Sequence, residues 1–412
     1  MSAEESRAFG LRIAELRKQR GMKQEELAAI LGRTASWLSQ VERGVQPVNR
    51  LDVLRMLADG LGVPIQTLRP DTPAPASVPA EHVGVSNDLD QARLTISGYP
   101  VPDVLLAANV AESVVDVGEL QTAVDAVWKL AHESRFAELS SAIGPLIPRL
   151  ERAARTAQGA DRPTLWLLLS RTYQALSAAF VRQDEPDAAW LAADRSISAA
   201  ERSGEVLHVF AGVYRLAQAF VRLKHLDQGE HAATTAVNAL RQYVSGATAN
   251  PEALSVLGSL HLALALVHAR SGNRADARRE IENAREIARK LGADRNDLNL
   301  EFGPTNVDIQ AVSIAVDLGD AGEAIDIGER INAEQLSIER RARLAMDLGR
   351  ACAQRRQSGE ALAYLLEAEK MAPELIQTHV AARNAIRELI LIAGRAASPE
   401  LKALADRADA QP

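Results

Sequence analysis

Five residues between positions 35 and 43 have side chains that could contact a nucleic acid, and their spacing places them on one face of a helix. They are Ala35, Ser36, Ser39, Gln40 and Arg43. At about 100° per residue, Leu38 and Val41 point to the opposite side, where they could pack in a core. Short hydroxyl and amide groups can pair with base edges in a DNA major groove, where Gln40 suits adenine and Ala35 suits a thymine methyl. The guanidinium of Arg43 suits a phosphate.

This face needs a preceding helix and a tight turn to position it. Leu27 and Ile30 recur at helical spacing, and Gly32 follows where a left-handed C-cap is easiest. Thr34 offers a hydroxyl N-cap for the second helix. We therefore expect a helix, a turn and a helix over residues 24–44.

Similar patterns of apolar residues, caps and stops predict three more helices, at residues 6–20, about 49–61 and 64–68. Phe9 and Ile13 begin the apolar stripe of the first of them. The five helices together span about sixty residues, which is enough for a small domain of marginal stability.

Three motifs occur in order within this segment: QEELA from Gln24, LG from Leu31 and LSQVERG from Leu38. In this order and spacing they resemble the lambda-repressor/Cro-like helix-turn-helix family of the xenobiotic-response-element (XRE) type. The resemblance extends from Phe9 to about Leu68. It implies a five-helix domain that binds double-stranded DNA, with Gln24 holding a phosphate at the start of its helix.

The expected DNA contacts fall into two groups. Base edges would be read by Ala35, Ser36, Ser39 and Gln40. Phosphates would be contacted by Lys23, Gln24, Arg33, Thr34, Trp37 and Arg43. Trp37 lies on the flank of its helix, where it could pack in the core or meet the sugar-phosphate backbone. Lys23 stands where the family often has a Ser or Thr cap, and Arg33 replaces a commonly apolar turn residue. These departures concern the target sequence more than DNA binding itself.

Charge separates the N-terminal part from the rest of the chain. Residues 1–70 hold 11 Lys and Arg against 8 Asp and Glu, and the remainder holds 36 against 46, within a formal net charge of −7. Only the N-terminal part therefore suits a polyanion. No uninterrupted apolar run reaches about 18 residues, and acids stand where a signal peptide would be basic. We expect a cytoplasmic protein with no membrane span.

The segment 69–79, RPDTPAPASVP, has four prolines and almost nothing to bury. It reads as a semi-extended linker. We therefore expect a DNA-binding domain at 1–69, a Pro-rich linker at 70–87 and a second domain at 88–412.

The second domain shows a repeated pattern of helices. Small residues that would open the second helix of each pair are Ala189, Gly229, Ala277, Ala324 and Ala361. Their steps of 40, 48, 47 and 37 residues exceed the nominal repeat of about 34 in the tetratricopeptide pattern, which this one resembles. The expected fold is all-α: a five-helix domain followed by an α-solenoid of tetratricopeptide-like hairpins. Helices before residue 160 and after residue 378 would act as caps or as a dimer surface.

A concave side of such a solenoid would carry polar side chains that suit an extended peptide or a small molecule. The repeat register places there Arg171, Gln174, Tyr214, Gln218, Arg222, Asn306, Arg343, Met346 and Arg350. The combination of the two domains resembles the peptide-sensing regulators of the Rgg and PlcR type. That resemblance implies a homodimeric transcription regulator whose effector, a signal peptide or a small molecule, binds the groove.

Two other interpretations stay open. One is a scaffold that holds a partner protein in the groove, with the DNA-binding domain used for localisation. The other is a groove that modulates an enzyme, as in the related peptide-sensing phosphatases.

Catalysis and metal binding find little support in the sequence, which has no GxxxxGK[ST], HExxH or GxSxG motif. His261 and His268 could share a helix face, but no third ligand or nearby carboxylate accompanies them, so we expect packing or groove residues. Cys352, the one cysteine, excludes an internal disulfide and stands at an apolar repeat position, which favours a buried thiol over a redox sensor. We expect a protein that is not an enzyme and needs no cofactor.

Overall fold

The computed structural model describes residues 3–31, 35–45, 57, 60–61, 63, 89–106, 116–244, 250–334 and 337–411. The chain divides into two compact units, Met1–Ser86 and Asn87–Pro412. Within the described ranges every regular element is a helix, and the strand-like pairing there is an isolated bridge between Arg295 and Phe302. The all-α fold class is confirmed.

The first unit contains α1 (Ala3–Gln19), α2 (Gln24–Ile30) and α3 (Ala35–Glu42). Its core is formed by Phe9, Ile13, Leu16, Leu27, Ala28, Leu31, Leu38, Val41, Leu57 and Leu61. The predicted apolar stripes of the first three helices are therefore the buried ones. Most of the segments expected as helices at 49–61 and 64–68, and the linker, lie outside the described residues.

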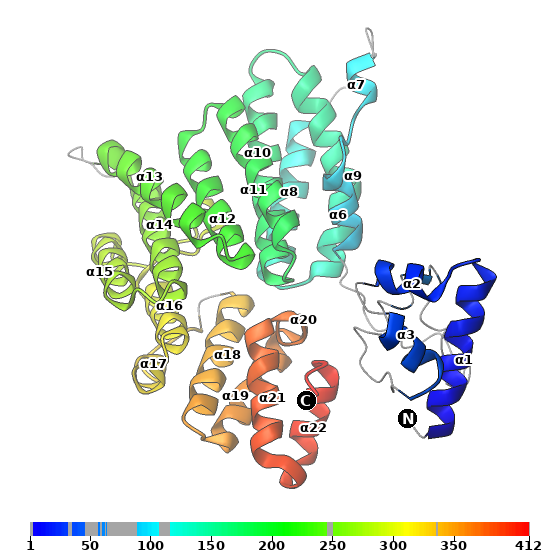
Figure 1. Cartoon of the computed structure of the whole chain (residues 1–412). Helices are drawn as coiled ribbons and strands as arrows, with labels where there is room; N and C mark the ends of the chain where they lie inside the picture. The colour runs from blue at the N-terminus through cyan, green and yellow to red at the C-terminus, as the bar shows by residue number, and fades with distance from the viewer. Residues whose placement is uncertain are drawn as a thin grey trace. The chain divides into compact units, whose positions relative to one another are not determined.

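The second unit is a succession of helices that follow one another along an arc, from α6 to α22 (Figure 1). It begins with α6 (Asp90–Ser97), α7 (Asp103–Leu106), α8 (Val117–His132), α9 (Phe136–Thr156), α10 (Asp161–Arg182) and α11 (Pro186–Ser203). It continues with α12 (Val206–Leu223), α13 (Leu226–Val244), α14 (Pro251–Arg270), α15 (Arg274–Leu291), the short η1 (Asp297–Asn299), α16 (Pro304–Asp317) and α17 (Ala321–Gly328). It ends with α18 (Ile338–Gln354), α19 (Ser358–Met371), α20 (Pro373–Thr378), α21 (Val380–Ala393), η2 (Gly394–Ala396) and α22 (Pro399–Arg407).

One turn geometry joins the helices of each pair. A residue with positive φ is followed by a backbone N–H that donates to the carbonyl five positions earlier, which is the Schellman C-cap. The positive-φ residues are Ser134, Asp184, Lys224, Gly272, Gly319 and Arg356. The last five are separated by 40, 48, 47 and 37 residues, so the predicted register is confirmed. The pair α8 and α9 uses the same turn, so the pattern begins one hairpin earlier than expected.

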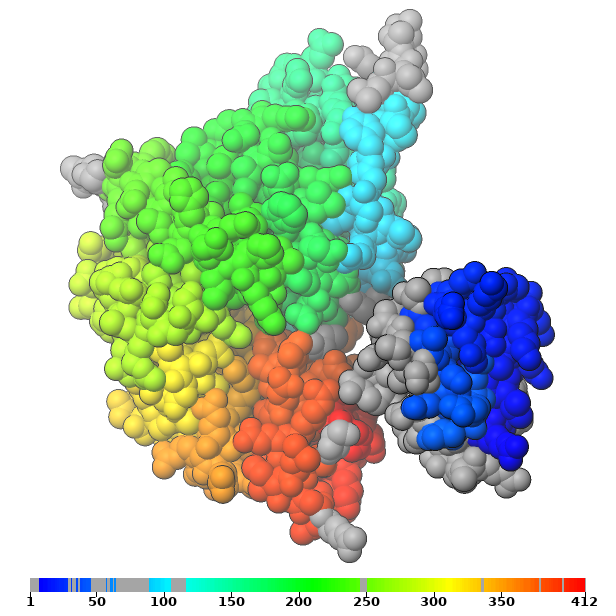
Figure 2. All heavy atoms as spheres, in the orientation of Figure 1, coloured from blue at the N-terminus to red at the C-terminus, as the bar shows by residue number. Residues whose placement is uncertain are grey.

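Small residues let the paired helices approach closely. Ala189, Ala277, Ala324 and Ala361 are fully buried, each near the start of the second helix of its pair. A side chain at Gly349 of α18 would press on Leu365 of α19. Consecutive pairs also bury large apolar side chains between them, so the second unit is a continuously packed body (Figure 2).

Among the described residues, α12 and α14 are long and apolar enough to cross a membrane by length and composition. Polar or charged residues interrupt both helices, so no uninterrupted apolar run marked them in the sequence. α14 is 89% buried inside the unit and packs against α12, α13 and α15, as a core helix of a repeat protein does. α12 is 33% buried and lies between α10, α11, α13 and α14. Packing between neighbouring pairs therefore accounts for the apolar character of α14.

A close approach at Gly258 of α14 gives a first prediction. Phe302 is fully buried and lies against this glycine, so an added Cβ would overlap the aromatic ring. We expect Gly258→Ala to lower the free energy of unfolding by about 1–3 kcal/mol, although alanine is the better helix former. Denaturant unfolding followed by circular dichroism measures this. Gly359→Ala in α19 is the control, because a Cβ there meets nothing within 4 Å; equal effects of the two changes would contradict the packing argument.

Candidate DNA-reading surface and effector site

The buried and exposed sides of α3 are the ones that its helical period predicts. Leu38 and Val41 are fully buried, while Ser39 and Gln40 are partly exposed and Arg43 is exposed. Ala35, at the start of the helix, is also partly exposed. The backbone at positions 36 and 37 is helical, but the side chains of Ser36 and Trp37 lie outside the described part. Arg33 and Thr34 lie outside it altogether.

A buried ion pair fixes α3 against α1. Arg17 donates from Nε and Nη2 to the two carboxylate oxygens of Glu42, over 2.6 and 3.0 Å. Its Nη1 also donates to the carbonyl oxygen of Met22, over 2.7 Å, which ties the turn before α2 to the same group. The hydrogen bonds that Arg17 donates to Glu42 raise the pKa of Arg17. The sequence reading missed this pair; Gly10 carried a signal for it, because a Cβ there would overlap the backbone of Val41 and Glu42.

The start of α2 is held by two side chains. Gln24 donates from Nε2 to Glu42 Oε2 over 2.6 Å, so the amide expected to meet a phosphate is oriented by the same carboxylate. One amide hydrogen of Gln24 remains for a second acceptor. The N–H of Lys23 donates to the carboxylate of Glu26 over 2.8 Å, which supplies half of a capping box where a Ser or Thr cap was missing.

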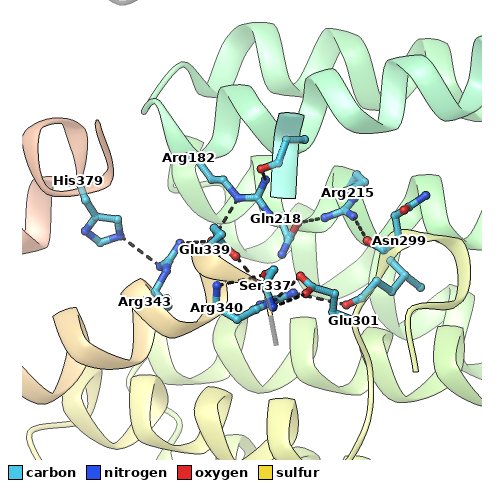
Figure 3. A network of polar contacts seen from close by, with 12 residues as sticks. Arg182, Arg215, Gln218, Asn299, Glu301, Ser337, Glu339, Arg340, Arg343 and His379 are labelled. Atoms are coloured by element: carbon cyan, nitrogen blue, oxygen red, sulfur yellow. Dashed lines mark hydrogen bonds and ion pairs between the residues drawn. The ribbon is translucent and has the colours of Figure 1, made fainter. Parts of the chain in front are cut away.

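A network of charged side chains joins helices that are far apart in sequence in the second unit (Figure 3). Arg182, at the end of α10, pairs with Glu339, at the start of α18, over 3.2 Å. Arg340 pairs with Glu301 over 3.2 Å and donates to the carbonyl oxygen of Leu300. Glu301 also accepts from the N–H of Ser337 over 3.4 Å. These contacts bring the early and late hairpins of the repeat together.

α12 contributes two arginines, Arg215 and Arg222, that have no carboxylate partner among the described residues. Arg215 is buried; it donates to Gln218 Oε1 over 3.3 Å and to the carbonyl oxygen of Asn299 over 2.9 Å. Its guanidinium also lies 5.5 Å from the ring centroid of Trp128. Burial lowers the pKa of each arginine to about 10, so both remain charged at neutral pH.

His379 lies between two guanidinium groups. Its Nε2 is 3.2 Å from Arg222 Nη2 and 3.3 Å from Arg343 Nη1. Burial, with these two cations and two further arginines nearby, holds the pKa of His379 well below its usual 6.5. The imidazole is therefore neutral at physiological pH, with Nε2 as the acceptor.

A cavity of about 490 Å³ opens beside this network. It lies between α8, α10, η1 and the start of α18. Its lining residues are Asp125, Trp128, Lys129, His132, Glu133, Arg171, Asn299, Ser337 and Ile338. Burial lowers the pKa of His132 to about 4, so this imidazole is uncharged at neutral pH. An aromatic wall with charged groups around it can hold a ligand that has both apolar and polar parts.

Residues 8–71 match the family model of a helix-turn-helix domain. The chain therefore contains a helix-turn-helix domain, which is followed by a helical-repeat unit. Among solved structures, PlcR of Bacillus thuringiensis in complex with the peptide PapR7 and DNA is similar at 14% identity and a TM-score of 0.37, over 88% of this chain and 99% of that one. A comparison with curated proteins found no match.

The second unit places the expected groove residues in three different environments. Arg171 lines the cavity and pairs with Asp125 over 2.6 Å. Tyr214, Gln218, Arg222, Arg343 and Arg350 belong to polar networks of the interior. Gln174, Asn306 and Met346 are buried, so in this structure they do not line an open groove. Their helical register was predicted, but the packing of neighbouring pairs over them was not.

Two other reactive side chains of the second unit, His261 and Cys352, are buried. Glu280 lies 2.6 Å from Nδ1 of His261 but 19 positions away in sequence, so this carboxylate partner was not visible at short spacing. Burial alone would raise the pKa of Glu280, but the hydrogen bonds of His261 and Asn283 outweigh it and lower the pKa to about 2. Cys352 is buried, and burial raises the pKa of its thiol. Within the part of the chain that the structure describes, no group of three His, Cys, Asp or Glu side chains could hold a metal ion.

Proposed function

We propose that this chain is a cytoplasmic, homodimeric transcription regulator that reads a specific DNA sequence with α3 and senses an effector with its helical-repeat unit. The observation that carries the proposal is the helix-turn-helix match at residues 8–71 together with the outward face of α3. The excess of basic residues in the first 70 positions supports a polyanionic partner. A dimer follows from geometry, since one recognition helix reads only a few base pairs and a two-fold pair spans about 34 Å.

Base edges are read by Ala35, Ser36, Ser39 and Gln40 in this proposal. Phosphates are held by Lys23, Gln24, Arg33, Thr34, Trp37 and Arg43. Selection of bound fragments from a genomic DNA library tests the proposal. Enrichment of a two-fold-symmetric site is expected; failure to enrich any site, with or without cell extract, would contradict it.

Substitutions on α3 separate base contacts from phosphate contacts. Gln40→Ala is expected to cost about 1–3 kcal/mol at one base position and to relax specificity there. Arg43→Ala should weaken binding to all sequences alike and reduce the dependence of affinity on salt. Binding titrations on the selected site and on variants with one base changed measure both effects. If the two substitutions give the same profile, the assignment of roles is wrong.

We place the effector, a peptide or a small molecule, in the cavity between α8, α10 and α18. α18 is far from α8 and α10 in sequence. A ligand that touches all three helices would therefore stabilise one arrangement of the helical pairs over others. Such a shift could alter how two DNA-binding domains are held in a dimer. Native mass spectrometry of the purified full chain tests for a retained ligand.

Ile338→Glu, which adds a charge to the cavity wall, should release the retained ligand. Leu391→Glu, at another exposed apolar position, should keep it. Retention by both variants would place the ligand elsewhere.

A further inference from the structure

Arg222 and Arg343 meet at a single acceptor. Both guanidinium groups lie within 3.3 Å of His379 Nε2, one from α12 and one from α18. A neutral imidazole nitrogen has one lone pair, so it accepts one strong hydrogen bond rather than two. One of the two cations is therefore poorly satisfied at this point.

The carboxylates nearby form ion pairs with other arginines, although Asp347 Oδ2 accepts no hydrogen bond within the described ranges. Asp317 pairs with Arg270 and Arg350, over 2.9 and 2.7 Å. Asp347 pairs with Arg350 over 2.6 Å. Asp184, which acts on Arg222 at longer range, is exposed to solvent.

Glu339 is also committed elsewhere. It lies 3.9 Å from Arg343 but closer to Arg182, at 3.2 Å. The cluster of Arg222, Arg270, Arg343 and Arg350 thus faces two aspartates and one shared glutamate, and it carries an excess of positive charge. That excess favours an anionic ligand.

His379 itself carries an unsatisfied group. When Nε2 accepts, the proton of the neutral ring must be on Nδ1, and Nδ1 is buried without a hydrogen-bond partner within the described ranges. A buried donor without an acceptor costs about 1–3 kcal/mol. The observed arrangement therefore leaves two donors without a good acceptor, namely one of the two guanidinium groups and the Nδ1–H of His379.

The two arginines are within reach of a solute. Arg222 and Arg343 are both partly exposed, although His379 between them is buried. Their partial exposure gives a solute a route to this pair of side chains. Guanidinium groups bind carboxylate and phosphate oxygens in paired, charge-assisted hydrogen bonds.

We propose that Arg222, Arg343 and His379 form a binding site for an oxyanion, a carboxylate or phosphate group, apart from the residues that line the cavity. A regulatory role for this anion rests on the function proposed above, whereas anion binding does not. Each oxyanion oxygen offers several lone pairs, so both guanidinium groups are satisfied at once. The anion also compensates the excess charge, and His379 then takes up a proton on Nε2 and becomes a third donor.

Anion binding is tested on the full chain without DNA. Thermal unfolding is measured against rising concentrations of sodium phosphate, of sodium acetate and of trialanine with a free or an amidated C-terminus, each at the ionic strength of a sodium chloride reference. We expect a saturable rise in Tm above the chloride reference. A rise with phosphate alone identifies a phosphate group, and a rise with acetate and free trialanine but not the amide identifies a carboxylate.

Variants show whether the response comes from this site, because phosphate also stabilises proteins non-specifically. Arg222→Gln and Arg343→Gln should each weaken anion binding by about tenfold or more. Arg341→Gln, which removes an exposed arginine from the same helix, is the matched control and should respond like the wild type. An equal response in all four proteins, or no rise above chloride, overturns the proposal.

A second measurement does not depend on the arginine variants. In ¹⁵N NMR of histidine-labelled wild type, the resonance that disappears in His379→Gln should change from the neutral Nδ1–H form to the doubly protonated form as the anion is added. An unchanged resonance at anion saturation overturns the proposal. DNA binding is measured separately, by selection from the DNA library without added anion. Failure of the anion site would change the Tm and NMR results, whereas failure of the proposed function would change the DNA selection.

Discussion

Replacing Glu42 by alanine is expected to unfold most of the first unit, because the change leaves Arg17 buried without its carboxylate. Removing one partner of a buried ion pair costs about 3–5 kcal/mol. A domain of about seventy residues has a total stability of similar size. Gln24 also loses its acceptor, so the start of α2 is released in the same step.

Hydrogen exchange with mass spectrometry measures this in the full chain, because it follows α1, α2 and α3 separately from the second unit. Amides of these three helices should lose most of their protection, and operator binding should disappear with it. Glu15→Ala is the control, since its pairing with Arg12 at 3.7 Å is exposed and contributes little. Full protection in Glu42→Ala would show that the pair is not needed for folding.

A compensating variant separates charge from packing. Arg17→Met combined with Glu42→Leu removes both charges and keeps apolar volume, which is often neutral or stabilising in a buried pair. We expect most amide protection to return. Because Gln24 still lacks its acceptor, DNA affinity should recover less than stability does.

The sequence predicted which side of α3 is exposed but not what fixes the helix in place. Leu38, Val41 and Gln40 follow from the period of one helix, which is a local property. The pairing of Arg17 with Glu42 joins residues 25 positions apart and depends on how closely α1 approaches α3. Gly10 permits that approach, but a glycine in a helix has several possible reasons, so it did not identify its partner.

In the repeat unit, too, the sequence predicted local features but not the long-range contacts. The spacing of small residues such as Ala277 and Ala361 gave the pairing of helices, because close helix contact needs small side chains there. The turns were harder to find, since Asp184, Lys224 and Arg356 occupy the positive-φ position where glycine would have marked it. The interior network could not be predicted, because contact between Arg182 and Glu339 depends on rotations accumulated over four hairpins.

Replacing Glu339 by alanine is expected to lower the free energy of unfolding of the second unit by about 3–5 kcal/mol. This carboxylate is buried among Arg182, Arg340 and Arg343 (Figure 3). Its loss leaves Arg182 without the carboxylate that joins α10 to α18. Denaturant unfolding followed by circular dichroism measures the effect, with Glu138→Ala as the control because its pair with Arg135 is exposed.

The carboxylate of Glu339 should also make the stability of the second unit depend on pH. Burial alone would raise the pKa of Glu339, but the surrounding arginines outweigh it and lower the pKa from 4.5 to about 2. The unfolded chain therefore binds this proton more readily, so the stabilisation is complete above about pH 4.5 and is lost as the pH falls toward 2. In Glu339→Gln this part of the acid destabilisation should be absent, and identical pH profiles for the variant and the wild type would contradict the assignment.

Replacing Glu339 should also affect ligand binding in the proposed cavity site. The residues before Glu339 line the cavity, and Arg343 after it contacts His379. Ser337 and Ile338 line the cavity, and Arg343 meets His379 one turn later along α18. If the ion pair with Arg182 holds the start of α18 in place, Glu339→Gln should weaken retention of a cavity ligand more than Glu138→Ala does. Unchanged ligand retention in a destabilised Glu339→Gln protein would show that the pair supports folding without positioning the cavity.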